Sequence, residues 1–215
     1  MYRYADGEGE PEPLSLTGIA LRYAIGLAVV VAALMAGSTV EAHEGAGGAE
    51  GLIAGLTHPL LGLDHLVAMV AVGLWGAFLG MPAVWLLPMV FPLIMALAAL
   101  AGMSGLPLPG AEIGIALSAI VIGLAIAMMK RAPLPAAVLI VGLFAIFHGH
   151  AHGVELPEAA HPFAYAAGFV AMTGLLHIGG ILLGLMIAVP AGLIAVRAIG
   201  AGIAAVGLLF LTGVV

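Results

Sequence analysis

Six long apolar runs, separated by breaks that contain glycine or proline, fill the chain after residue 50. Each run has about the length that an α-helix needs to cross a bilayer, roughly 20 residues. Hydrophobic residues make up 64% of the 215 residues and charged residues only 7%, which leaves almost no room for a soluble domain. The sequence therefore predicts an all-α integral membrane protein, a six-helix transmembrane bundle over residues 51–80, 82–103, 111–130, 134–156, 161–188 and 191–213.

The segment before these runs has the pattern of a signal peptide. Residues 24–37 form an apolar core that follows Arg22 and precedes the small-residue motif Val40-Glu41-Ala42. We expect residues 1–42 to be a targeting segment cleaved after Ala42, which would leave residues 43–215 as the transmembrane domain. The alternative is that the segment stays as an uncleaved anchor.

The few basic residues predict the orientation. Lys130 and Arg131 lie between the third and fourth runs, and Arg197 lies in the first turns of the sixth. Basic residues favour the cytoplasmic side, so the mature N-terminus should lie in the periplasm. The outer end of the bundle would then be acidic and rich in histidine, a surface that concentrates cations.

Composition excludes several kinds of function. The chain has no cysteine, so it has neither disulfides nor thiolate metal sites. It has no basic patch for nucleic acid and no nucleotide-binding loop, H-E-x-x-H or G-x-S-x-G motif. Any metal would be held by nitrogen and oxygen, with methionine thioethers as a further option.

The first cluster of ionisable residues is H-P-L-L-G-L-D-H, from His58 to His65. Ionisable groups at membrane depth are costly and mark functional sites, so we interpret His58, Asp64 and His65 as metal ligands. On one continuous helix His58 and His65 would be about 10 Å apart, too far for one ion. Either a half-helix ending near Pro59 folds His58 back toward the other two, or the histidines are successive stations on a path. The structural alternative is that His58 caps a helix and the other two form a buried pair.

The second cluster is F-H-G-H-A-H-G-V-E, from Phe147 to Glu155. His148, His152 and Glu155 are spaced i, i+4 and i+7, which places them on one stripe of a helix. Histidines at i and i+4 are about 6 Å apart, a spacing suited to one metal ion. His150 should point the opposite way, and we interpret it as a solvated residue at a helix end.

Four further residues are weaker candidates. His177 lies deep in the fifth run. It could be an inner metal ligand or proton carrier, or a core histidine that is hydrogen-bonded to a carbonyl. Glu112 opens the third run, as a ligand or as a cap that complements the helix dipole. Phe91 is typical of the core. Cleavage after Ala42 would give His43 a free amine, which could chelate a metal together with the imidazole of the same residue. The alternative is that His43 is simply tolerated after a cleavage site.

The segments H-P-L-L-G-L-D-H-L-V-A-M-V-A-V-G-L-W and F-H-G-H-A-H-G-V-E-L-P resemble the HupE/UreJ family of hydrogenase and urease accessory membrane proteins, which are nickel permeases. The resemblance runs from about residue 43 to the C-terminus. It implies a bacterial inner-membrane protein that is not an enzyme, needs no organic cofactor, and takes up Ni²⁺, sometimes Co²⁺, without ATP. Nickel-enzyme maturation proteins become candidate partners. The motif residues that carry over are His58, Asp64, His65, His148, His152 and Glu155, with Glu112 and Phe91 in less specific segments.

Two other classes of function compete with transport. In an intramembrane zinc hydrolase, Asp64 would act as a general base and Ser118 or Ser104 as an auxiliary donor. In a metal receptor or chaperone, binding would occur without flux. The residue types do not distinguish Ni²⁺ from Co²⁺, Zn²⁺ or Cu²⁺.

Overall fold

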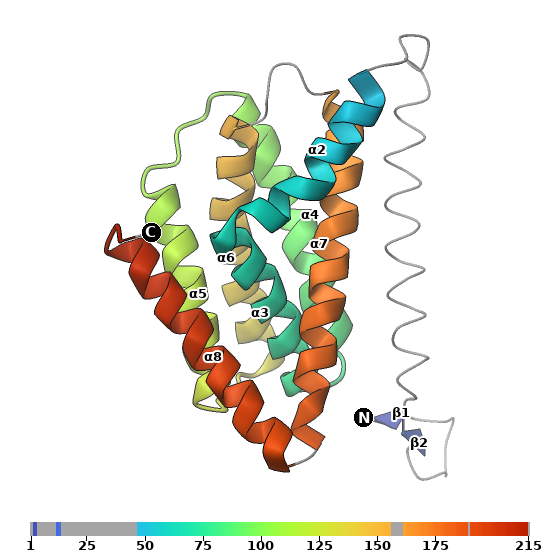
Figure 1. Ribbon diagram of the computed structural model, residues 1–215, viewed down its shortest axis with the longest axis vertical. Helices are drawn as coiled ribbons and strands as arrows, with labels where there is room; N and C mark the ends of the chain where they lie inside the picture. The colour runs from blue at the N-terminus through green and yellow to red at the C-terminus, as the bar shows by residue number, and fades with distance from the viewer. Residues whose placement is uncertain (1, 4–11, 14–46, 156–160, 189, 215) are drawn as a thin grey trace.

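The computed structural model describes residues 2–3, 12–13, 47–155, 161–188 and 190–214 (Figure 1). Two short strands, β1 (Tyr2–Arg3) and β2 (Glu12–Pro13), pair antiparallel. The rest of the described chain is helical: α2 (Gly47–Leu61), α3 (Leu63–Leu79), α4 (Ala83–Met103), α5 (Ala111–Ala127), α6 (Leu134–Glu155), α7 (Pro162–Gly184), the 3-10 helix η2 (Leu185–Ala188) and α8 (Pro190–Leu211). The predicted cleavage site after Ala42 lies outside the described residues.

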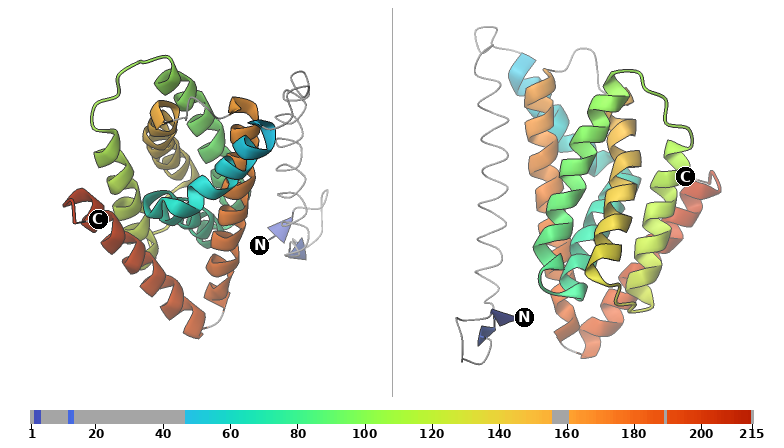
Figure 2. Two further views of the ribbon diagram at one scale, coloured as in Figure 1. Left: turned by 45° about the horizontal axis from the view of Figure 1, so that its top comes forward. Right: turned by 180° about the vertical axis from the view of Figure 1, so that it is seen from behind.

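The helices form one bundle, in which most helices pack closely against one or two others. Helix α4 packs against α6, α5 packs against α8, and α2 and α3 both pack against α7 (Figure 1). Figure 2 shows α8 at the outer side of the bundle, next to α5. Large apolar side chains, among them Leu93, Leu139 and Ile194, are exposed on the outer faces, as lipid contact requires.

Within the described ranges, α4, α6, α7 with η2, and α8 are each long and apolar enough to cross a membrane. Helices α2 and α3 qualify only together, as one span broken by an 80° bend. Helix α5, with 17 residues, is apolar but shorter. The prediction of a helical membrane protein is confirmed, whereas six complete spans remain a prediction.

Helix α5 ends three residues earlier than the apolar run 111–130 predicts. Met129 has a left-handed φ of 54°, so the chain leaves the helix before Lys130. The Nε of Arg197, on α8, donates a hydrogen bond to the Ala127 carbonyl at 3.0 Å. Lys130, Arg131 and Arg197 therefore lie at the same end of the bundle, as the orientation argument expects.

Glycines allow the closest helix contacts. A Cβ at Gly149 or Gly153, on α6, would collide with the carbonyls of Met95 and Ala99 on α4. A Cβ at Gly180, on α7, would collide with the Val70 carbonyl on α3. At these positions the missing side chain lets the helix backbones approach closely, as is common at helix contacts in membrane proteins.

We expect Gly180→Ala to lower the stability of the folded protein by about 1–3 kcal/mol, because its methyl group would push α3 and α7 apart. Gly179→Ala is the matched control, since a Cβ at that neighbouring position meets nothing within 4 Å. Thermal unfolding of both variants in detergent measures the difference. Equal stabilities would mean that α3 and α7 are not in this contact.

Candidate metal site

The break between α2 and α3 brings the two ends of the first histidine motif together. Helix α2 ends at Leu61 and α3 begins at Leu63, with Gly62 in an extended conformation between them. The rings of His58 and His65 are 5.9 Å apart between centroids, far closer than a continuous helix allows. Of the two arrangements open from the sequence, the structure has the folded-back one. The helix breaks at a different place from the one predicted. Pro59 lies inside the last turn of α2, and the chain bends at Gly62 instead.

Helix α6 adds the second motif to the same place. The rings of His65 and His152 are 4.2 Å apart, those of His65 and His148 are 5.3 Å apart, and those of His58 and His152 are 5.0 Å apart. Histidines from three helices thus form one cluster, which we call the histidine cluster: His58, His65, His148 and His152.

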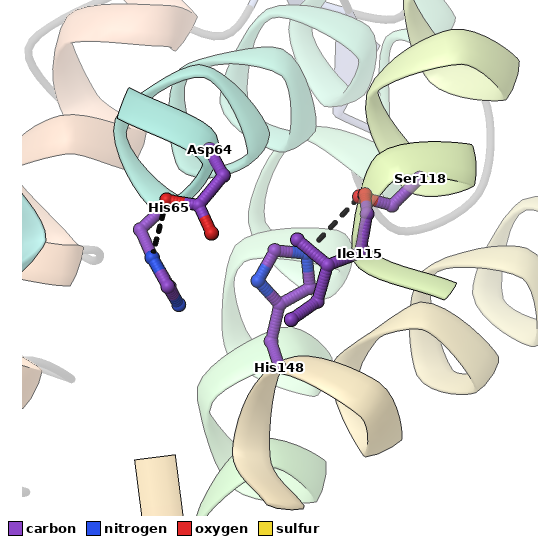
Figure 3. A network of polar contacts seen from close by, with 5 residues as sticks. All are labelled: Asp64, His65, Ile115, Ser118 and His148. Carbon is purple, nitrogen blue, oxygen red and sulfur yellow. Dashed lines mark hydrogen bonds and ion pairs between the residues drawn. The ribbon is translucent and has the colours of Figure 1, made fainter. Parts of the chain in front are cut away.

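Asp64 is attached to this cluster through His65. The Nδ1 of His65 donates a hydrogen bond to the Asp64 Oδ1 at 2.8 Å (Figure 3). In a neutral imidazole this leaves the lone pair on Nε2, the form that binds a metal. Gly62 makes the pair possible, because a Cβ there would lie 2.7 Å from His65 Nδ1 and 3.0 Å from Asp64 Oδ1.

Several buried ring nitrogens of the cluster have no hydrogen-bond partner in the described part of the chain. They are His65 Nε2, His148 Nδ1 and both nitrogens of His152. The residues that carry them are at most 6% exposed. A buried polar atom without a partner costs about 1–3 kcal/mol, so core histidines normally satisfy both nitrogens. The sequence alternative of an ordinary buried pair leaves all of these nitrogens without a partner, whereas a cation could take one nitrogen of each ring.

The cluster is not a finished coordination sphere. No group of three or more His, Asp or Glu side chains among the described residues is arranged so that it could hold a metal ion as it stands. Neighbouring rings lie 4.2–5.9 Å apart, so rotations about side-chain bonds would be needed to aim their nitrogens at one point.

Two predicted residues continue from the cluster along the bundle. The ring of Phe91, on α4, lies 5.5 Å from that of His148 and 5.8 Å from that of His177 on α7. Phe91 and His177 are both fully buried. Phe91 therefore lies between the histidine cluster and a further histidine, a position that its apolar character did not predict.

Of three other candidates, Glu112 lies outside the cluster, and the side chains of Glu155 and His43 lie outside the described part of the chain. Glu112 is exposed in the first turn of α5, which fits its reading as a dipole-complementing residue. Glu155 is the last residue of α6, at the predicted helical spacing from His148 and His152, but its side chain lies outside the described part. His43 also lies outside the described residues.

His150 corrects the sequence interpretation. It does point away from the cluster, but it is buried rather than solvated, and its Nε2 donates a hydrogen bond to the Leu106 carbonyl at 2.6 Å. This bond ties α6 to the loop between α4 and α5. Helical periodicity predicted the direction of the His150 side chain. It could not predict that the side chain is buried, because the loop that covers it is distant in the sequence.

The structure also shows which neighbours enclose the cluster; of these, the sequence named only Ser118, as an auxiliary donor in the hydrolase alternative. The ring of Phe169, on α7, lies 4.4 Å from that of His152, and the ring of Tyr165 lies 5.9 Å from that of His58. Ser118, on α5, hydrogen-bonds to His148 at 3.0 Å. The position of Ser118 within an apolar run was the only available signal for it, since a fully buried hydroxyl needs a partner.

Comparison with known proteins identifies the family of the chain. The family model described as "HupE / UreJ protein" matches residues 19–210. The chain is 42% identical to "Protein HupE" of Rhizobium leguminosarum bv. viciae over 187 residues, which cover 87% of this chain and 97% of that protein. No solved structure gives a significant match. The chain therefore belongs to the HupE/UreJ family, whose members are transporter-type accessory proteins and not enzymes.

Proposed function

We propose that this protein takes up nickel(II) across the bacterial inner membrane, as a secondary permease without ATP hydrolysis, and so supplies nickel enzymes such as hydrogenase or urease. Cobalt(II) is the second candidate substrate. Membership of the HupE/UreJ family supports a role in nickel uptake. The intramembrane hydrolase considered as a rival is excluded, because the family is not one of enzymes.

One observation carries the proposal: buried imidazole nitrogens without partners gather beside a carboxylate. Neutral imidazole and ionised carboxylate are ligands suited to a divalent transition metal. The ion would be held by His65 and His152, whose rings are closest, with His58, His148 and Asp64 around them. Coordination would give one orphaned nitrogen of each of these rings a partner.

The same arrangement supports passage of the ion rather than storage. The cluster sits at the junction of α2, α3 and α6, and Phe91 separates it from the deeper His177. An aromatic side chain between two sets of ligands must move for an ion to pass, so it keeps the two sides separate at rest. We propose that His177 is the inner station, and that Glu112, Glu155 and His43 serve the outer mouth.

Uptake of radiolabelled Ni²⁺ tests the proposed function. Purified protein in liposomes without ATP should accumulate Ni²⁺ well above empty liposomes, and competition by excess Co²⁺, Zn²⁺ and Cu²⁺ ranks the metals that the protein accepts. Binding of Ni²⁺ to the purified protein without accumulation would instead make it a receptor or chaperone. Accumulation only with ATP would remove the secondary mechanism.

The targeting segment belongs to the same proposal. Cleavage after Ala42 would place the amine and imidazole of His43 at the outer mouth, where they would collect scarce metal. Sequencing the mature N-terminus checks this directly, since any other first residue rules out that chelate.

A further inference from the structure

We propose that Ser118 is a positioning residue that fixes the tautomer of His148, so that Nδ1 is the nitrogen presented to the transported ion. The inference rests on the proposed function, since it assigns a role beside the same site. Ser118 lies on α5, a helix that supplies no member of the histidine cluster.

The hydroxyl of Ser118 has two partners. Its Oγ lies 2.6 Å from the Ile115 carbonyl and 3.0 Å from His148 Nε2 (Figure 3). Ser118 is 1% exposed and His148 is fully buried, so water does not compete for either group. A serine hydroxyl has one proton to donate and lone pairs that accept.

Only one assignment satisfies both bonds. The Ile115 carbonyl can only accept, so the Ser118 proton must point to it. His148 Nε2 must then carry a proton and donate it to Ser118 Oγ. A neutral imidazole has one N–H, which leaves a lone pair on His148 Nδ1.

The remaining nitrogen faces the cluster. His148 Nδ1 has no hydrogen-bond partner in the described part of the chain, and in Figure 3 it points to the side where Asp64 and His65 lie. The His148 ring is 5.3 Å from the His65 ring. In the opposite tautomer, Nδ1–H would be a buried donor without an acceptor, aimed at the place where a cation must bind.

His65 and His148 are therefore oriented by the same principle through different nitrogens. Asp64 takes the Nδ1–H of His65 and leaves Nε2 for the metal, whereas Ser118 takes the Nε2–H of His148 and leaves Nδ1. Groups that orient a ligating histidine in this way typically change metal affinity by about 10–100-fold when they are removed.

The experiment reads the tautomer without metal and then the affinity with it. In protein labelled with ¹⁵N-histidine, the His148 signal is identified by its loss in His148→Asn. We expect Nε2–H in the wild type, a shift toward Nδ1–H in Ser118→Ala, and Nε2–H again in Ser118→Thr, which restores a hydroxyl. Ni²⁺ binding by the purified protein should weaken by about 10–100-fold in Ser118→Ala and recover in Ser118→Thr.

Ser104→Ala is the matched control. Ser104 also donates to a carbonyl three residues earlier, that of Ala101, at 2.8 Å, but it is exposed just after the end of α4. It should change neither the tautomer nor the affinity. An Nδ1–H tautomer in the wild type, or unchanged tautomer and affinity in Ser118→Ala, overturns the inference about Ser118. Failure of the wild type to bind Ni²⁺ overturns the proposed function instead, and the metal-free spectra distinguish the two failures.

Discussion

Asp64→Asn should abolish nickel uptake while the protein still folds and inserts. Asparagine keeps the shape of the side chain, and its carbonyl oxygen can still accept the hydrogen bond from His65 Nδ1. The substitution removes only the negative charge, in a site where burial makes charge interactions strong. We expect uptake at saturating Ni²⁺ to fall by about 100-fold, the upper end of the range for residues that support metal ligands.

Glu50→Gln provides a control for this experiment. It removes one carboxylate charge from an exposed position in the first turn of α2, away from the cluster. Uptake at saturating Ni²⁺ should stay at the wild-type level in this variant. If Asp64→Asn also transports normally under these conditions, the charge of Asp64 takes no part in moving the ion.

His148→Ala and His152→Ala should each lose most of the uptake, and His150→Ala should lose much less per inserted molecule. The first two remove rings that lie within 5.3 Å of the His65 ring, together with their unpartnered nitrogens. His150 faces the Leu106 carbonyl instead, so its loss should lower folding yield more than transport. Uptake divided by the amount of inserted protein separates the two effects.

Equal losses of uptake per inserted molecule in all three variants would contradict this division of roles. That result would mean that the face of α6 that carries His148 and His152 is not the side that meets the ion. The thermal stability of the three purified variants gives a second comparison. His150→Ala should be the least stable of the three, because it loses the hydrogen bond to the Leu106 carbonyl.

Helical periodicity predicted the parts of the site that depend on one helix. The stripe formed by His148 and His152, and the opposite direction of His150, follow from 3.6 residues per turn. Periodicity could not choose between a folded-back His58 and separate stations, because the choice depends on where the helix breaks. The break occurs at Gly62, where the missing side chain leaves room for the bond between Asp64 and His65.

Contacts between distant segments account for what the sequence did not predict. The burial of His150 depends on a loop 44 residues away, and the hydrogen bond between Ser118 and His148 joins residues 30 apart. The early end of α5 depends on a left-handed residue at Met129, a conformation that methionine rarely adopts. None of these is visible in the order of apolar and polar residues alone.

The break at Gly62 also bears on how long an ion would stay bound. It places the carbonyl end of α2 beside His58 and the amide end of α3 beside Asp64 and His65. The first end carries a partial negative charge that attracts a cation, and the second carries a partial positive charge that opposes one. A carrier needs a site strong enough to capture its ion and weak enough to give it up. The amide end of α3 therefore shortens the residence time of a cation on Asp64, whereas the carbonyl end of α2 prolongs its contact with His58.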